Sequence, residues 1–194
     1  YQEGVIKTND ISKVNLKSNI NHEMFKWLKV GANISGNYLH NNRIPGANLG
    51  STIIGRAVQQ RPFDRPYKPN GGYYTGGTDE LLLHNAVQIL SEETSYTDNY
   101  RFIGSFWAEA QIIKGLTVRA SYNNDSAYTY DYIYYNQNHP YAADKGRILD
   151  RNRFVMTNTI DLYANYNRKI GEDFELGAMV GHSFLKTRSR TSYI

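Results

Sequence analysis

The chain of 194 residues contains no cysteine and only five prolines. The absence of cysteine excludes disulfides, thiolate nucleophiles and cysteine-based zinc sites. The sequence also lacks any run of about 18 apolar residues, the length that a membrane-spanning helix needs. Membrane-spanning β-strands alternate apolar and polar residues and produce no such run, so this second absence leaves a β-barrel open.

The chain also lacks a strong excess of positive or negative charge. Lys and Arg number 22 against 18 Asp and Glu, which gives a net charge of +4, and the basic residues are scattered along the chain. A surface that binds nucleic acid concentrates positive charge in a patch or stripe. We therefore expect no nucleic-acid partner.

Tyrosine and glycine are abundant, with 17 and 16 residues, in a chain whose mean hydropathy is −0.61. Disordered segments are poor in aromatic residues, so the composition argues against disorder. Tyr, Asn, Thr and Gly are weak helix formers, which argues against a helical bundle. The composition therefore predicts a mostly β protein.

Six segments alternate between apolar and polar residues with a period of two, which is typical of strands with one apolar face. They are about 13–24, 28–38, 100–112, 116–125, 154–166 and 174–184. Most strands of soluble proteins are shorter, about 5–6 residues. Short connections pair the segments into three hairpins, and long loops at about 40–99 and 131–150 separate the hairpins. Alternating short and long connections are typical of an outer-membrane barrel.

The first long loop contains signals of local structure. Ser51 could cap a short helix over 52–60, and Asn85 could cap a second one that ends at Leu90. Three prolines stiffen the segment 61–69 between them. We therefore expect this loop to be folded.

Two architectures can use such strands. In a soluble β-sandwich the apolar faces pack together, whereas in a barrel they face lipid and the polar faces line a lumen. The strand length and the loop pattern favour the barrel, and Phe25, Trp27, Tyr166 and Phe174 near the short turns suit an interfacial girdle. Six strands alone would leave open edges, which a bilayer does not tolerate. We predict an all-β fold of antiparallel up-and-down strands, a partial segment of a large transmembrane β-barrel.

Several stretches of the sequence resemble one family specifically. They are KWLKVGAN at 26–33, IGRAVQQRPFDRPY at 54–67, YYTGGTD at 73–79, HNAVQIL at 84–90, DYIYYN at 131–136 and AMVGHS at 178–183. Together they make the chain similar to the SusC/RagA-type TonB-dependent outer-membrane transporters. The family usually has Asn-Pro-Val where this chain has Asn85, Ala86 and Val87, a departure that leaves the helix cap intact.

The resemblance implies a transporter with an N-terminal plug inside a barrel of about 22 strands. It also implies a location in the outer membrane, energy supplied through TonB and a SusD-like surface lipoprotein as a partner. The substrate would be an oligosaccharide or a similar large nutrient, and a peptide remains possible. Residues 1–194 would form part of the barrel. The chain starts at Tyr1 without an initiator methionine, so we expect the plug and the TonB contact to lie outside it.

We expect ligand-binding residues in the external loops and on the lumen face. The candidates are Arg61, Phe63, Arg65, Tyr67, Tyr73, Tyr74, Trp107, Tyr132, Tyr134, Tyr135 and Asn136. The tyrosines of 128–135 could stack on sugars or form the outer aromatic girdle. The loop residues 61–68 could bind substrate or lid, or only stabilise the loop itself. Trp107 could touch solute, or contact the plug or a neighbouring charge.

Residue patterns for catalysis and metal binding are weak. The five histidines lack metal-binding spacing, and no serine lies in a nucleophile elbow. Adjacent carboxylates such as Glu92 and Glu93 are typical of solvated turns. We therefore predict no enzyme activity, no metal and no cofactor. The alternative function from another class is a soluble or surface-exposed β-sandwich that binds carbohydrate, and a self-assembling structural β-protein is a third.

Overall fold

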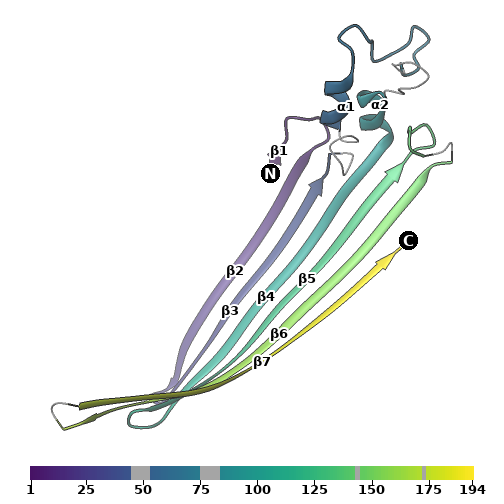
Figure 1. Ribbon diagram of the computed structural model, residues 1–194. Helices are drawn as coiled ribbons and strands as arrows, with labels where there is room; N and C mark the ends of the chain where they lie inside the picture. The colour runs from purple at the N-terminus through teal and green to yellow at the C-terminus, as the bar shows by residue number, and fades with distance from the viewer. Residues whose placement is uncertain (45–52, 75–83, 143–144, 172–173) are drawn as a thin grey trace.

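The computed structural model describes residues 1–44, 53–74, 84–142, 145–171 and 174–194. The described strands form one antiparallel sheet in the order β1-β2-β3-β4-β5-β6-β7, so every strand pairs with its neighbours in sequence (Figure 1). Their bounds are β1 Gln2–Glu3, β2 Asp10–Phe25, β3 Leu28–Asn42, β4 Glu93–Ile113, β5 Leu116–Tyr135, β6 Arg147–Ile170 and β7 Phe174–Tyr193. The predicted antiparallel up-and-down order is confirmed.

The strands are longer than the alternation predicted, and the difference lies at the ends away from the short turns. β4 begins at Glu93 and β5 continues to Tyr135, so the predicted loops at 40–99 and 131–150 are too wide. The connections that separate the hairpins instead span 43–92 and 136–146. Tyr, Thr and Asn replace aliphatic residues in these extensions, which hides the alternation, although Tyr and Thr favour strands.

The register of the sheet assigns each strand residue to one of two faces. Tyr38 lies opposite Tyr100, Tyr100 opposite Tyr128, and Tyr128 opposite Phe154. Side chains alternate between faces along a strand, so even-numbered residues of β2–β7 share one face and odd-numbered residues the other. Irregular pairing occurs beside two hairpin turns, at Glu23/Phe25 and Gln111/Ile113. We call the two sides the even face and the odd face.

The even face carries the apolar side chains, and they are exposed. Leu16 is 74% exposed and Val180 is 71% exposed. The buried hydrophobic residues, Ile53, Ile89 and Ala142, all lie outside the strands. Within the described residues only one sheet is present, so no second layer covers the apolar face as a β-sandwich would require. An apolar surface of this extent indicates a partner that covers it.

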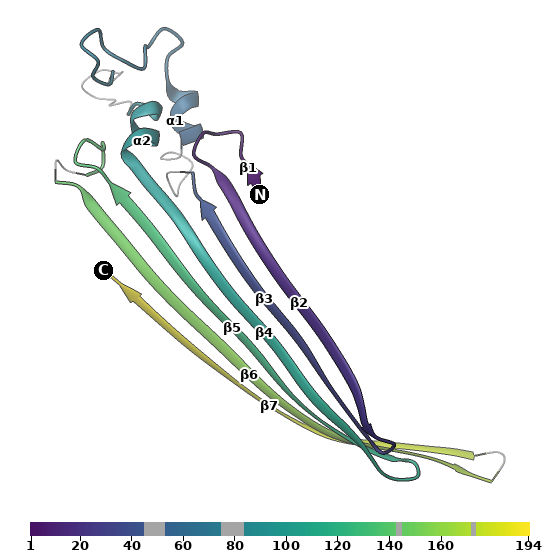
Figure 2. The same ribbon diagram turned by 180° about the vertical axis from the view of Figure 1, so that it is seen from behind.

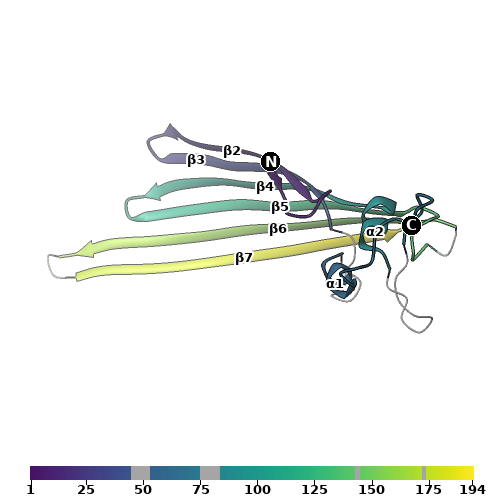
Figure 3. The ribbon, with the colours of Figure 1, turned by 90° about the horizontal axis from the view of Figure 1, so that it is seen from above.

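The hairpin turns at the short-connection end, which we call the turn end, are staggered. Leu28 begins β3 and pairs with Ala110, but β4 continues to Ile113. Leu116 begins β5 and pairs with Tyr166, but β6 continues to Ile170. Each hairpin therefore projects further than the one before it (Figure 3). Tilted strands in a barrel require such a progressive shift in register.

Two short helices, α1 Ile53–Gln59 and α2 Ala86–Glu92, lie near each other at the opposite end, the loop end (Figures 1 and 2). The predicted cap is confirmed, because the Asn85 side chain accepts hydrogen bonds from the backbone of Val87 and Gln88. The predicted cap of α1, Ser51, lies outside the described residues. Neither helix has the length and hydropathy to cross a membrane.

Candidate functional site

The segment after α1 is held by its own side chains. Arg61 donates two hydrogen bonds of 3.0 Å to the Asp64 carboxylate, and its guanidinium carbon lies 5.0 Å from the centroid of the Phe63 ring. The hydrogen bond with Asp64 raises the pKa of Arg61. Arg61 is therefore engaged inside the loop, whereas the neighbouring Phe63 is 75% exposed.

A second group of contacts ties this segment to α2. The rings of Tyr67 and Tyr73 lie 5.7 Å apart, and the Tyr73 hydroxyl lies 2.5 Å from Ser91 Oγ. The Asn85 amide, which is buried, donates to the carbonyls of Pro66 at 2.6 Å and Tyr74 at 3.0 Å. One side chain thus caps α2 and holds the segment between the helices at two points, Pro66 and Tyr74. Phe63, Arg65 and Tyr67 remain exposed, and we call them the loop surface.

Tyr132 and Tyr134 lie on the even face, not on a loop or with the polar odd face as predicted. They belong to β5, and Tyr132 packs on Tyr96 with ring centroids 5.1 Å apart. Neighbouring tyrosine hydroxyls are used inside the sheet, since Tyr38 donates to Asp98 and Tyr130 donates to Asp150, both at 3.0 Å. This aromatic cluster covers the loop end of the even face. Its position agrees with an aromatic girdle better than with a sugar-stacking site.

Trp107 lies on the odd face and contacts a neighbouring charge. The Arg119 guanidinium carbon lies 4.3 Å from the indole centroid, and Arg119 Nη1 lies 3.4 Å from Glu109. Gly31 is the residue opposite Trp107 in β3. A Cβ atom at Gly31 would lie 2.5 Å from the indole Nε1, so the glycine leaves the space in which the indole lies. The predicted contact of Trp107 with a neighbouring charge is therefore present.

Cross-strand polar contacts cover the rest of the odd face. Arg101 donates to both oxygens of Asp125, at 2.9 and 2.6 Å. Asp161 accepts hydrogen bonds from Asn123 at 3.2 Å and from Ser183 at 2.6 Å. Charges and hydroxyls on this face are therefore arranged in networks that run across neighbouring strands.

A carboxylate that the sequence analysis did not select anchors the loop end of the odd face. Asp131 is 8% exposed and accepts from Thr97 Oγ1 at 2.6 Å and from Arg151 Nε at 2.8 Å, with Arg43 Nη1 at 3.6 Å. Burial alone would raise the pKa of Asp131, but these hydrogen bonds and charges outweigh burial and lower it. The sequence contained a signal for this residue, because Asp131 is an odd-numbered position like Asp125 and so belongs to the same polar face of the strand.

Tyr135 and Asn136 lie beside this cluster at the end of β5. The Tyr135 ring centroid lies 4.5 Å from that of His139, and His139 Nε2 lies 3.6 Å from the buried carboxylate of Glu93. Burial raises the pKa of Tyr135. The backbone amide of Asn136 donates to the Glu92 carbonyl at 2.9 Å. Both residues therefore help to join β5 to the end of α2.

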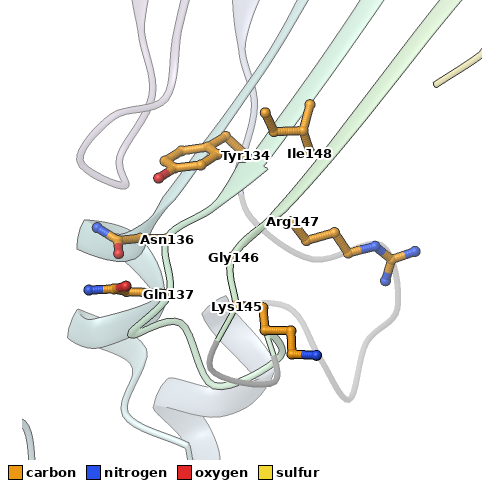
Figure 4. A pocket seen from close by; sticks show the side chains of 7 residues that line it. All are labelled: Tyr134, Asn136, Gln137, Lys145, Gly146, Arg147 and Ile148. Atoms are coloured by element: carbon orange, nitrogen blue, oxygen red, sulfur yellow. The ribbon is translucent and has the colours of Figure 1, made fainter.

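An open cavity of about 510 Å³ lies beside the connection from β5 to β6, and Tyr134 and Asn136 help to line it. Figure 4 shows Lys145 and Arg147 extending to one side of the chain and Tyr134 to the other. Groups that diverge in this way do not hold one ligand together. In the described ranges, no three His, Asp or Glu side chains are grouped to hold a metal ion either.

The predicted binding residues are thus divided among three surfaces. Arg61, Phe63, Arg65, Tyr67, Tyr73 and Tyr74 belong to the segment between the helices, Tyr132 and Tyr134 to the even face, and Trp107 and Tyr135 to the odd face, with Asn136 following β5. The structure does not bring them into one pocket. The loop surface and the odd face at Tyr135 and Asp131 offer polar and aromatic groups at the loop end of the sheet.

Comparison with known proteins was made for sequence and for fold. No family model matches the chain. The chain is 25% identical over 195 residues to TonB-dependent receptor P26 from Formosa agariphila, and the match covers 95% of the chain and 18% of that receptor.

Solved structures with the same fold include the RagAB peptide transporter, with a TM-score of 0.74 and 21% identity over 95% of this chain and 22% of that chain. The RagAB peptide importer in its closed-closed state matches with a TM-score of 0.72 and 22% identity over the same shares. The chain thus spans about a fifth of the length of these proteins. In sequence the chain is thus similar to a segment of a TonB-dependent receptor, and in fold it matches a segment of the RagAB structures, in agreement with the SusC/RagA-type resemblance of its sequence.

Proposed function

We propose that the chain forms part of the wall of an outer-membrane importer of large nutrients. Its even face contacts lipid, and its odd face lines a water-filled lumen. The observation that carries this proposal is the single-layered sheet, with exposed apolar side chains on one face and cross-strand polar networks on the other. Residues 1–194 would then be barrel wall, with the plug elsewhere in the transporter.

The apolar length of the strands supports this orientation. The even face of β3 is free of charged residues from Leu28 to Tyr38, and the polar His40 follows. A barrel strand needs about 9–11 residues to cross the hydrocarbon core. At the turn end, Phe25 and Trp27 stack with ring centroids 5.7 Å apart, which suits the inner interface. The loop end with its two helices then lies outside the cell.

The substrate that we propose is an oligosaccharide. The loop surface offers the exposed rings of Phe63 and Tyr67 for stacking on sugars, and the odd face offers hydrogen-bonding groups along the path. A peptide is the second candidate, favoured by the likeness to RagAB, whose structures are described as those of a peptide transporter. Both substrates bind without covalent chemistry.

The partners follow from the family resemblance. A SusD-like lipoprotein would cover the outer opening, and the loop surface is positioned to contact such a lid. TonB would act through the plug, outside this chain. Exposed aromatic and arginine side chains such as those of the loop surface are typical anchors of protein contacts.

Uptake by whole cells tests the proposal. A strain that lacks the gene is expected to lose uptake of a labelled oligosaccharide mixture or of labelled peptides, and the class that is lost identifies the substrate. A Phe63→Ala/Tyr67→Ala double variant is expected to raise the half-saturating concentration about 30-fold, since each of the two aromatic contacts contributes on the order of 1 kcal/mol. Val58→Ala, which removes an exposed apolar side chain of α1, is the control. Unchanged uptake of both classes in the deletion strain would refute the proposal.

A further inference from the structure

Three basic side chains occupy successive even-face positions of β7, the strand at one edge of the sheet (Figure 1). Lys186 lies opposite Asn158, Arg188 opposite Met156 and Arg190 opposite Phe154. All three basic residues are exposed. We call them the basic row.

The basic row begins where the apolar surface of β7 ends. Val180 and Phe184 precede it on the even face and are 71% and 55% exposed. At the level of Lys186 the neighbouring strands also turn polar, because Asn158 lies opposite Asn124 and accepts a hydrogen bond of 2.8 Å from it. The basic row therefore follows the apolar residues of β7 toward the loop end, with Lys186 level with polar neighbours and with Arg188 and Arg190 beside Met156 and Phe154.

The basic row lies on the even face and is not part of the ion pairs that cross the odd face. Arg101, Arg119 and Arg151, all on the odd face, each contact a carboxylate. Among the residues that the structure describes, no Asp or Glu forms an ion pair with Lys186, Arg188 or Arg190. Three exposed cations in a row favour an anionic partner that the chain itself does not supply.

We propose that the basic row binds the phosphate groups of anionic lipid headgroups in the outer leaflet. This inference rests on the proposed function, because it requires the even face to meet lipid. The row lies at the height where apolar chains give way to headgroups. Arginine binds phosphate through parallel hydrogen bonds, and each basic residue near an anionic membrane surface contributes about 1 kcal/mol, or about fivefold in affinity.

The test uses the full-length transporter in detergent, titrated with diphosphoryl lipid A and with the same lipid after removal of both phosphates, and followed by native mass spectrometry. The unmodified transporter is expected to prefer the phosphorylated lipid. The variant Lys186→Gln/Arg188→Gln/Arg190→Gln is expected to lose affinity for it by roughly 100-fold, from three cations of about fivefold each. High salt is expected to weaken the same binding.

Arg153→Gln is the matched control. Arg153 is an exposed arginine on the odd face of β6. It lies opposite Thr191, the residue that follows Arg190 in β7. It is expected to leave lipid affinity unchanged, whereas Arg190→Gln alone lowers it about fivefold. The charge-conserving variant Lys186→Arg/Arg188→Lys/Arg190→Lys is expected to retain binding.

The outcomes separate this inference from the proposed function. A transporter found outside the outer-membrane fraction would overturn both. A transporter that reaches the outer membrane and imports nutrients, but binds both forms of lipid A equally, would overturn the lipid site alone. If the triple variant is destabilised but its lipid affinity is unchanged, the basic row forms ion pairs with carboxylates of a neighbouring strand. This result would also overturn the lipid site.

Discussion

The contact between Gly31 and Trp107 shows how one small residue shapes the polar face. The indole lies over the glycine and beside Arg119, at a position where no larger side chain fits on β3. Side chains on facing strands form the stabilising pairs of a sheet, so the loss of this arrangement changes both stability and the shape of the odd face.

Gly31→Ala is expected to lower the stability of the barrel by about 1–3 kcal/mol, because the new methyl group must displace the indole. The emission of Trp107 is also expected to change, measured in a background in which Trp107 is the sole tryptophan. Gly36→Ala in the same strand is the control, since nothing lies within 4 Å of the added Cβ atom. Equal effects of the two substitutions on chemical denaturation would contradict the account.

Asp131 connects three strands at the loop end of the odd face. Its carboxylate lies on β5 and accepts hydrogen bonds from Thr97 of β4 and Arg151 of β6. Its lowered pKa gives a pH dependence. The folded-state pKa lies below the unfolded value of about 3.9, so the carboxylate stabilises the fold above that pH and loses its contribution as pH falls through the folded-state pKa.

Asp131→Asn is expected to cost about 1–3 kcal/mol at neutral pH, since it leaves Arg151 without its acceptor charge. The variant is also expected to lose less stability than the unmodified transporter between about pH 4 and the folded-state pKa. Denaturation measured over a series of pH values tests both effects. Parallel pH profiles for the two proteins would show that Asp131 does not carry this dependence.

Among the elements, α2 organises the loop end. Its cap residue Asn85 also holds the carbonyls of Pro66 and Tyr74, so the helix and the Pro-rich segment are stabilised together. This arrangement positions the exposed rings of the loop surface.

Asn85→Ala is expected to destabilise this region by about 1–2 kcal/mol for the lost cap alone, and to expose the segment 60–74 to protease. Limited proteolysis with mapping of the cleavage sites measures the effect. Asn70→Ala is the control, because Asn70 is exposed and accepts a local hydrogen bond from Gly72 two residues away. Equal protection of the segment in both variants would argue against this role of Asn85.

The elements predicted best from the sequence were those with a local signal. Aliphatic alternation located the three hairpins and assigned their faces, and Asn85 is a favoured capping residue. The extended end of β5 escaped prediction because tyrosines occur at successive even positions there, and that of β4 because its even positions carry Thr94, Tyr96 and Asp98 instead of aliphatic residues. Tyr134 and Tyr135 are adjacent in β5, so their side chains lie on opposite faces of the sheet. This separation could not be predicted while the segment was taken for a loop.

The candidate site was predicted less well than the fold. A hydrogen bond between residues three apart, as in Arg61 and Asp64, has a local signal. The cluster of Asp131, Thr97 and Arg151 joins residues from three strands, and its composition depends on register. Without the register, the sequence does not show which polar residues hydrogen-bond to a neighbouring strand and which remain available to a solute.

At the scale of the whole molecule, the sheet is a surface without a core. Its buried apolar residues belong to the helices and a loop, while the strands expose theirs on the even face. The progressive stagger of the hairpins adds the tilt that a closed barrel needs. In the proposed barrel, the stability of the strands therefore depends on lipid on one face and on further strands at both edges.

Spin labelling of the full-length transporter in lipid bilayers tests the central claim that the even face meets lipid and the odd face meets water. In a background that lacks other cysteines, labels are placed by Ala108→Cys and Ala120→Cys on the even face and by Ser105→Cys and Ser121→Cys on the odd face. The account predicts that labels at the two alanine positions collide mainly with oxygen dissolved in lipid. Labels at the two serine positions are expected to collide mainly with a water-soluble nickel chelate. Equal accessibility at neighbouring positions, or the reverse pattern, would contradict it.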